Sequence, residues 1–340
     1  MTILPLRLWP GVEPSVSLLE SESRDGYDCL LIEYNAVGQE RVQSYLLIPS
    51  GVAPDSGYPA LVLLHDHGAR FDIGKEKLVR PIGSSSEHIR KSARQWVDAN
   101  FDGVFLADSL ARLGFVVIVP DALYWGSRSS ELCRRWSRMQ FGDETPPTDL
   151  RALKREVYEG QRTVYDSLAR RGIVWAEQTL NEDAAAARLL SALECVDSRR
   201  IGCAGWSMGG HRAWLLAAFC PEIKGGAAIS WMTLKRTQAT PPSASDYSML
   251  VPQMRERYDF PDIASWLSPK PFLFLSGRED HLFPEDATAE AFRRMQEIYA
   301  DTAPGALRTE FFPGGHHCGL GVQQRLIGFL SAEIAGSEGE

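Results

Sequence analysis

A serine set between glycines, where an apolar run meets a helical segment, is a group in this chain that could do chemistry. Residues 205–209 read Gly-Trp-Ser-Met-Gly, with the apolar run before them and a helical pattern at 211–219. A strand that turns sharply into a helix through a serine is the layout of a nucleophile elbow. In so crowded a turn a Cβ on either glycine would collide with a neighbouring strand or helix. Gly-x-Ser-x-Gly is common by itself, so the flanking elements carry the argument. We predict that Ser207 is a nucleophile and that the Met208 amide points at a developing oxyanion.

A carboxylate follows a later strand, as an acid partner would. The apolar run 272–275 leads into Ser-Gly-Arg-Glu-Asp-His at 276–281. A carboxylate just past the carboxyl end of a late strand can reach a histidine near the elbow. Asp280 is our candidate, and the adjacent Glu279 is an alternative on charge alone. Either residue could instead be a solvated turn carboxylate without a catalytic role. The chain order serine, aspartate, histidine favours Asp280.

Two adjacent histidines complete that order. His316 and His317 stand in a glycine-rich loop after the last expected strand. A histidine base must lean over the serine while its other ring nitrogen meets the acid. Adjacent residues point in different directions, so one of the two is the base. We predict His316, which directly follows two glycines, and expect His317 to pack or hydrogen-bond behind it.

A second oxyanion donor is expected from the loop after the third strand, which reads His-Asp-His-Gly at 65–68. We place this donor on the amide of His67, with Gly68 as the alternative. A metal site on His65 and His67 is the competing interpretation. A metallo-hydrolase site of this type would continue with Asp-His, where Ala-Arg stands, and no His-Glu-x-x-His occurs. We therefore expect neither metal nor cofactor, and structural roles for His211 and His281.

Alternating strand and helix patterns must position these groups. The continuous apolar run 60–65 is typical of a strand buried on both faces of a parallel sheet. Two strand-like runs at 27–34 and 41–48 predict a hairpin. Further strands are expected at 115–119, 226–231, 271–276 and 308–312, and helices at 106–113, 181–193, 284–299 and 322–334. The pattern predicts an α/β fold with a mostly parallel, doubly wound sheet and an antiparallel N-terminal hairpin at its edge.

The expected organisation is one domain over 27–335, preceded by a surface arm at 1–26 and followed by a tail at 336–340. Two intervals, about 69–101 and 122–180, are too long for simple connections and leave the ligand-binding end of the sheet. We predict that they form a lid or pocket wall over Ser207; surface padding or an oligomer contact is the alternative. The second interval contains the aromatic residues Tyr124, Trp125, Trp136, Phe141, Tyr158 and Tyr165.

Composition limits the partners. The 340-residue chain has a net charge of −8, which argues against a nucleic-acid partner. It has neither a signal-peptide pattern nor an apolar run of about 18 residues, so we expect a cytoplasmic protein without a membrane span. The six cysteines show no paired or metal-like spacing and are expected to be reduced. The arm at 1–26 could serve a homodimer.

Taken together, the motifs resemble the α/β-hydrolase superfamily, and within it the dienelactone-hydrolase and acetyl-xylan-esterase-like branch. The resemblance spans roughly residues 27–334 and is specific for the superfamily but weak for a substrate. It is carried by the segments 205–210, 277–280 and 313–316, together with 196–202, 258–263 and 269–271. The resemblance implies the α/β-hydrolase fold with lid-like insertions. It also implies a serine esterase, a carboxylic-ester hydrolase that acts on a small acyl or acetyl ester, for example of a carbohydrate.

Departures from the family patterns narrow the reaction. Dienelactone hydrolases proper resemble this chain but use a cysteine nucleophile, where Ser207 stands. Glucuronoyl esterases of the superfamily carry an arginine after the serine, where Met208 stands. The Gly-Trp-Ser motif is also similar to that of prolyl-oligopeptidase-type peptidases, whose β-propeller this chain has no room for. A peptidase or amidase on the same triad, or a non-catalytic binding protein of the same fold, are the alternatives to an esterase.

Overall fold

A single β-sheet organises the computed structural model, which describes residues 6, 8, 15–36, 41–142, 150–238 and 242–336. Within these residues nine strands follow the order β1-β2-β3-β5-β4-β6-β7-β8-β9. The strands are β1 (Val16–Arg24), β2 (Tyr27–Asn35), β3 (Arg41–Pro49), β4 (Tyr58–Leu64), β5 (Val116–Pro120), β6 (Val196–Trp206), β7 (Gly225–Ile229), β8 (Phe272–Gly277) and β9 (Leu307–Phe312). Pairing is antiparallel from β1 to β5 and parallel from β5 to β9. The mostly parallel sheet with an antiparallel N-terminal edge is confirmed.

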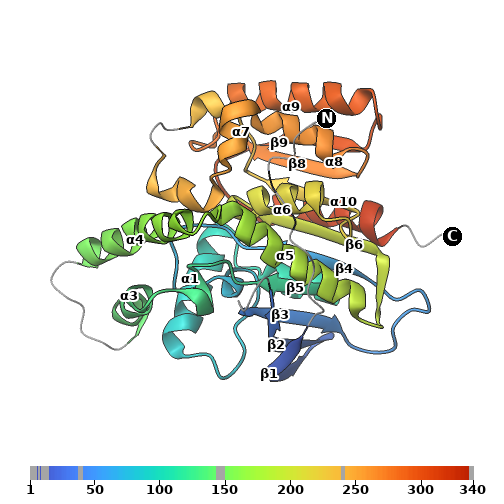
Figure 1. Cartoon of the computed structure of the whole chain (residues 1–340). Coiled ribbons are helices and arrows are strands. Elements are labelled where there is room, and N and C mark those ends of the chain that lie inside the picture. Colours follow the sequence, from blue (N-terminus) through green and yellow to red (C-terminus); the bar gives the residue numbers. More distant parts are fainter. Residues whose placement is uncertain are drawn as a thin grey trace.

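Helices cover both faces of the sheet (Figure 1). They are α1 (Glu87–Asn100), α2 (Leu106–Arg112), α3 (Glu131–Phe141), α4 (Leu150–Arg170), α5 (Trp175–Ala192), α6 (Met208–Phe219), α7 (Pro252–Arg257), α8 (Ala264–Leu267), α9 (Glu285–Ala300) and α10 (Leu320–Leu330). Successive side chains of a strand point to opposite faces. In β4, Val62 and Leu64 accordingly join a core with α5, α6 and α9, whereas Leu61 and Leu63 join a core with α1, α2 and α10. This two-sided burial is the reason for the continuous apolar run in the sequence.

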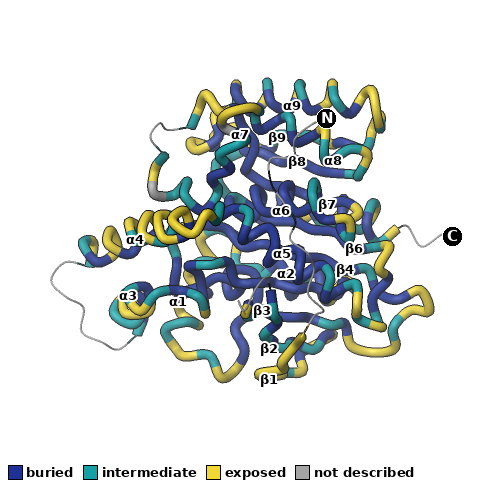
Figure 2. Tube along the Cα trace, in the orientation of Figure 1, coloured by how far each residue is buried: buried dark blue, intermediate teal, exposed yellow. Residues whose placement is uncertain are grey.

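The N-terminal segment differs from the expected arm. Residues 16–24 form β1, which pairs antiparallel with β2 as the edge strand. Most residues of β1 are exposed (Figure 2), and the side chains of Leu18 and Leu19 are among them, so the segment has no alternating hydrophobic pattern in the sequence. An edge strand needs only backbone partners on one side. Leu6 is buried in the core, while residues 1–5, 7 and 9–14, and the end of the expected tail at 337–340, lie outside the described residues.

The two predicted insertions contain helices. The first holds α1, and the second holds α3 and α4, which lie against each other beside the sheet (Figure 1). The helix expected at 181–193 is longer than predicted, since α5 begins at Trp175. In the described part of the chain, no helix has the length and apolar character needed to cross a bilayer.

The predicted lid is in large part a third hydrophobic core. Of the six aromatic residues named for it, Tyr124, Trp125, Trp136 and Phe141 are buried in this core, and Tyr165 packs against it. Tyr158, from α4, is the one among these six side chains that lines the cavity containing Ser207. The insertion therefore supplies one wall of the cavity, and most of its aromatic surface is used to attach the insertion itself.

Candidate active site

The turn from β6 into α6 holds Ser207 in a strained conformation. Its φ of 56° and ψ of −125° place a residue other than glycine at positive φ, which is uncommon and typical of functional sites. A Cβ at Gly205 would lie 2.3 Å from the carbonyl carbon of Gly209, and a Cβ at Gly209 would lie 1.9 Å from the oxygen of Leu64. The predicted collisions with the helix and the neighbouring strand are confirmed. Glycines at both positions allow the close approach that exposes the Ser207 hydroxyl.

One chain of hydrogen bonds joins the serine, the histidine and the aspartate. The Nε2 atom of His316 lies 2.9 Å from Ser207 Oγ, and its Nδ1 atom lies 2.7 Å from Asp280 Oδ2. Asp280 is buried, and its Oδ1 accepts the backbone N–H groups of Leu282 at 2.9 Å and Phe283 at 3.3 Å. In a neutral ring, an Nδ1 proton donated to Asp280 leaves Nε2 free to accept the serine proton.

Packing fixes the His316 ring. The Trp206 ring lies 4.9 Å from it between centroids, and the Phe283 ring stacks on it at 5.8 Å. These contacts restrict the imidazole to the orientation that the two hydrogen bonds require.

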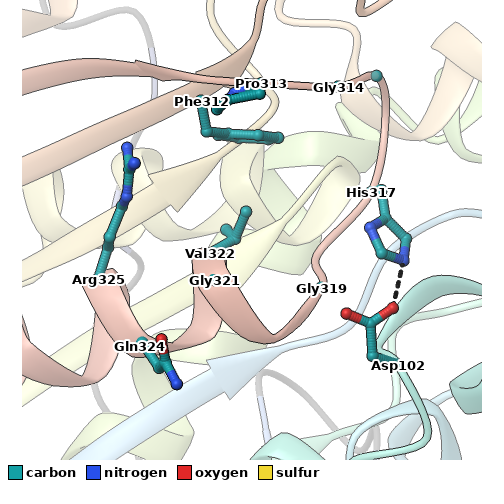
Figure 3. A pocket seen from close by; sticks show the side chains of 11 residues that line it. Asp102, Phe312, Pro313, Gly314, His317, Gly319, Gly321, Val322, Gln324 and Arg325 are labelled. Atoms are coloured by element: carbon teal, nitrogen blue, oxygen red, sulfur yellow. Dashed lines mark ion pairs between the residues drawn. The ribbon is translucent and has the colours of Figure 1, made fainter.

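The adjacent histidine faces elsewhere. Nε2 of His317 lies 3.2 Å from Oδ1 of Asp102, at the edge of a separate cavity of about 600 Å³ (Figure 3). His316 instead lines the cavity that holds Ser207. The structure therefore brings His316 and Asp280 to the serine, and leaves His317 and the exposed Glu279 outside this chain of hydrogen bonds.

The two amides predicted as oxyanion donors lie at corresponding places just after two neighbouring strands. Leu64 of β4 pairs with Gly205 of β6, and His67 and Met208 each stand three residues beyond that pair. His67 lines the cavity of about 560 Å³ that also contains Ser207. Met208 is the first residue of α6, so its N–H lies at the positive end of a helix. Both positions suit donors to a charge that develops on this side of the serine.

The imidazoles of the same loop are engaged inside the protein. Nε2 of His67 bonds to the Gln161 side chain at 2.8 Å, and its Nδ1 accepts the Ala69 N–H at 3.0 Å. Burial lowers the pKa of His67 to about 3, so this ring is neutral. Nε2 of His65 accepts the N–H of Ala122 at 3.1 Å, which leaves its Nδ1 to donate to the Asp66 carbonyl at 2.9 Å. These bonds occupy the nitrogens that a metal would need, and the described residues contain no cluster of three or more metal-ligating side chains.

The two histidines expected to be structural differ in position. His211 is buried against the rings of Trp214 and Trp231, at 4.6 and 4.4 Å between centroids, and burial lowers its pKa to about 3. His281, for which we also expected a structural role, lines the cavity beside His316.

Several other residues that line the cavity are not indicated by any sequence motif. Trp96 comes from α1, Trp231 follows β7, and Asp246 lies in a short 3-10 helix. No local motif marks them, because elements far apart in the chain bring them together. The cavity is lined by aromatic, hydroxyl and acidic side chains, and no lysine or arginine is among its described lining residues.

Comparisons with known proteins agree with this architecture. The model of the dienelactone hydrolase family matches residues 96–320, more than half of the chain. "Putative hydrolase YtaP" of Bacillus subtilis (strain 168) is 24% identical over 329 residues, covering 93% of this chain and 91% of that protein. A structure of a "putative acetyl xylan esterase" from Bacteroides fragilis NCTC 9343 superposes with a TM-score of 0.63 at 16% identity, covering 89% of this chain and 70% of that one. The glucuronoyl esterase from Solibacter usitatus gives 0.60 at 11% identity, covering 96% and 87%.

The fold resemblance predicted from the sequence is thereby confirmed, and the chain is a member of the dienelactone hydrolase family.

Proposed function

We propose that this protein is a serine esterase that cleaves small acyl esters, acetyl esters above all, through an acyl-enzyme. The observation that carries the proposal is the chain of hydrogen bonds from Ser207 through His316 to Asp280. Ser207 attacks the ester carbonyl while Nε2 of His316 takes its proton. Asp280 holds the imidazole in orientation and stabilises its cation. The amides of Met208 and His67 bind the tetrahedral oxyanion.

The same groups complete the cycle. His316 returns the proton to the leaving alcohol, and the acyl group stays on Ser207. Water, deprotonated by His316, then attacks the acyl-enzyme and releases the acid. A general base contributes about 10²–10⁴-fold and each oxyanion donor about 10²–10³-fold, so none of these steps needs a cofactor.

The cavity favours an uncharged ester. Trp96, Tyr158 and Trp231 offer aromatic surfaces, and Thr233 and Ser243 offer hydroxyl groups, a combination that suits a sugar alcohol. Asp66 and Asp246 line the same cavity, where the described lining residues include no lysine or arginine to pair with a carboxylate. Similarity in fold to a structure named as an acetyl xylan esterase supports the acetyl ester as the first substrate to test. A cytoplasmic location also belongs to the proposal, supported by six cysteines that are all free thiols.

The test is covalent labelling of the serine. Wild-type protein exposed to a fluorophosphonate should gain one adduct by intact mass and should hydrolyse p-nitrophenyl acetate. Ser207→Ala should do neither while keeping its unfolding temperature. Ser276→Ala is the control, because Ser276 likewise lies at the carboxyl end of a strand but is buried and does not line the cavity. An unlabelled wild type, or a labelled Ser207→Ala, would contradict the proposal. Comparable turnover of p-nitroacetanilide would favour an amidase instead.

A further inference from the structure

A fully buried lysine lies behind the loop that carries the proposed oxyanion donor. Lys77 ends a 3-10 turn (Lys75–Lys77) after β4, and its exposure is 0%. Its ammonium donates to the backbone carbonyls of Asp66 and His67, both at 2.8 Å, and lies 3.4 Å from the Asp66 carboxylate. Burying an ammonium is unfavourable unless such partners compensate for the lost water. Two of its three polar partners are thus the main chain of one short loop.

The two carbonyls belong to the peptides that carry the candidate oxyanion donors. A trans peptide is planar, with its C=O and N–H pointing in opposite directions. Fixing the carbonyl of Asp66 therefore fixes the N–H of His67, and fixing the carbonyl of His67 fixes the N–H of Gly68. Both His67 and Gly68 line the cavity that holds Ser207. Whichever of these amides meets the oxyanion, Lys77 holds the opposite end of its peptide.

Each of the two carbonyls also accepts a hydrogen bond from a neutral donor. The Asp66 carbonyl also receives Nδ1 of His65 at 2.9 Å, and the His67 carbonyl also receives the indole N–H of Trp125 at 3.0 Å. Hydrogen bonds in series polarise one another, and a charged donor gives the strongest effect. A cation on the carbonyl side strengthens the partial positive charge on the amide side, where negative charge develops only as the tetrahedral intermediate forms.

We propose that Lys77 is a positioning residue for the oxyanion hole, which orients and polarises the Asp66–His67 and His67–Gly68 peptides. The proposal rests on the esterase function proposed above. Its distinguishing consequence is that Lys77 supports the transition state more than the bound ester. Loss of the ammonium should therefore lower kcat and leave KM nearly unchanged.

Lys75 provides a matched control from the same turn. It is also buried, and its ammonium pairs with Asp121 at 2.7 Å and with Glu76 at 2.9 Å, and makes no hydrogen bond to the 66–68 loop. Lys77→Met should lower kcat for p-nitrophenyl acetate about 10–100-fold, somewhat less than the roughly 10²–10³-fold that follows removal of a whole donor. KM should stay within about threefold, and affinity for a trifluoromethyl ketone, which forms the oxyanion on Ser207, should fall in step with kcat/KM. Lys75→Met should lose comparable thermal stability but keep kcat within about threefold of wild type.

A second pair of variants guards against misfolding of Lys77→Met, which leaves the Asp66 carboxylate without its cation. Asp66→Asn removes that charge, so Asp66→Asn and Asp66→Asn/Lys77→Met differ only in the ammonium on the two carbonyls. The double variant should show the same loss of kcat, about 10–100-fold relative to Asp66→Asn alone, which is less than removal of a whole oxyanion donor would cause. Trp125→Phe, which deletes the neutral donor to His67, should lower kcat by less, about 2–10-fold.

The outcomes separate the two proposals. Suppose that wild type hydrolyses the ester and Ser207→Ala does not. Equal kcat in Lys77→Met and Lys75→Met, or equal kcat in the two Asp66→Asn variants, then overturns the proposed role of Lys77 and leaves the esterase proposal standing. A parallel loss of kcat and rise of KM with unchanged ketone affinity overturns it as well. If wild type neither hydrolyses ester nor reacts with the fluorophosphonate, the esterase proposal fails and the role of Lys77 fails with it.

Discussion

Asp280→Asn should abolish most turnover because it moves the proton of the neutral His316 ring from Nδ1 to Nε2. Oδ1 of Asp280 accepts two backbone N–H groups, while Oδ2 faces Nδ1 of His316. An asparagine keeps its single oxygen on the two N–H groups, because its NH₂ there would set donor against donor. The NH₂ then faces Nδ1, which must accept, and the ring proton moves to Nε2. In this form Nε2 donates to Ser207 and cannot take its proton.

The expected loss of kcat follows from the free-energy cost of the other orientation of the asparagine amide. Turning the amide round would restore the productive tautomer but leave two N–H donors without acceptors, at about 1–3 kcal/mol each. The productive form is therefore disfavoured by about 2–6 kcal/mol, which is roughly 30-fold to 10⁴-fold in rate. The corresponding change in a serine protease lowers kcat about 10⁴-fold, at the upper end of this range. We expect kcat to fall at least about 30-fold, with KM changed only a few-fold.

Steady-state hydrolysis of p-nitrophenyl acetate and the rate of fluorophosphonate labelling both report this change. Glu279→Gln is the control, since Glu279 is the adjacent carboxylate and is exposed. It should retain wild-type kcat. The unfolding temperature of Asp280→Asn should stay within a few degrees of wild type, because the packing around His316 is retained. A folded Asp280→Asn variant with kcat within a few-fold of wild type would refute the tautomer argument and the role of Asp280.

The remaining predictions concern the histidine pair and the elbow. His316→Ala should lower kcat about 10²–10⁴-fold, whereas His317→Ala, which removes the contact with Asp102, should lower it less than about tenfold. Ester hydrolysis by the two variants, assayed side by side, tests this. A larger loss in His317→Ala than in His316→Ala would make His317 the base. Gly209→Ala should lose serine labelling and several degrees of unfolding temperature, because its Cβ would lie 1.9 Å from the Leu64 backbone oxygen. Gly328→Ala, whose Cβ would meet nothing within 4 Å, should retain both. A Gly209→Ala variant with unchanged labelling and unfolding temperature would contradict the close packing of the elbow against β4.

Much of the fold and the candidate site could be predicted because their signals are local. Strands buried on both faces, such as β4, appear as continuous apolar runs, and Ser207, Asp280 and His316 each lie within four residues of the end of a strand. Parallel strands of one sheet direct their carboxyl ends to the same edge, so the order of the three residues along the chain already indicates that they meet. The glycines of the elbow could be interpreted for the same reason, since their constraint comes from residues a few positions away or on the neighbouring strand.

What only the tertiary structure decided depends on partners distant in the chain. Residues 16–24 lack a hydrophobic pattern because an edge strand is held by backbone pairing with β2. The aromatic residues of the second insertion could not be divided between cavity wall and third core, because their composition is the same in either place. The choice of His316 over His317 rests on which ring reaches Ser207. Lys77 carries no sequence signal at all, since a lysine in a polar loop suggests solvent until the fold encloses it against two carbonyl groups.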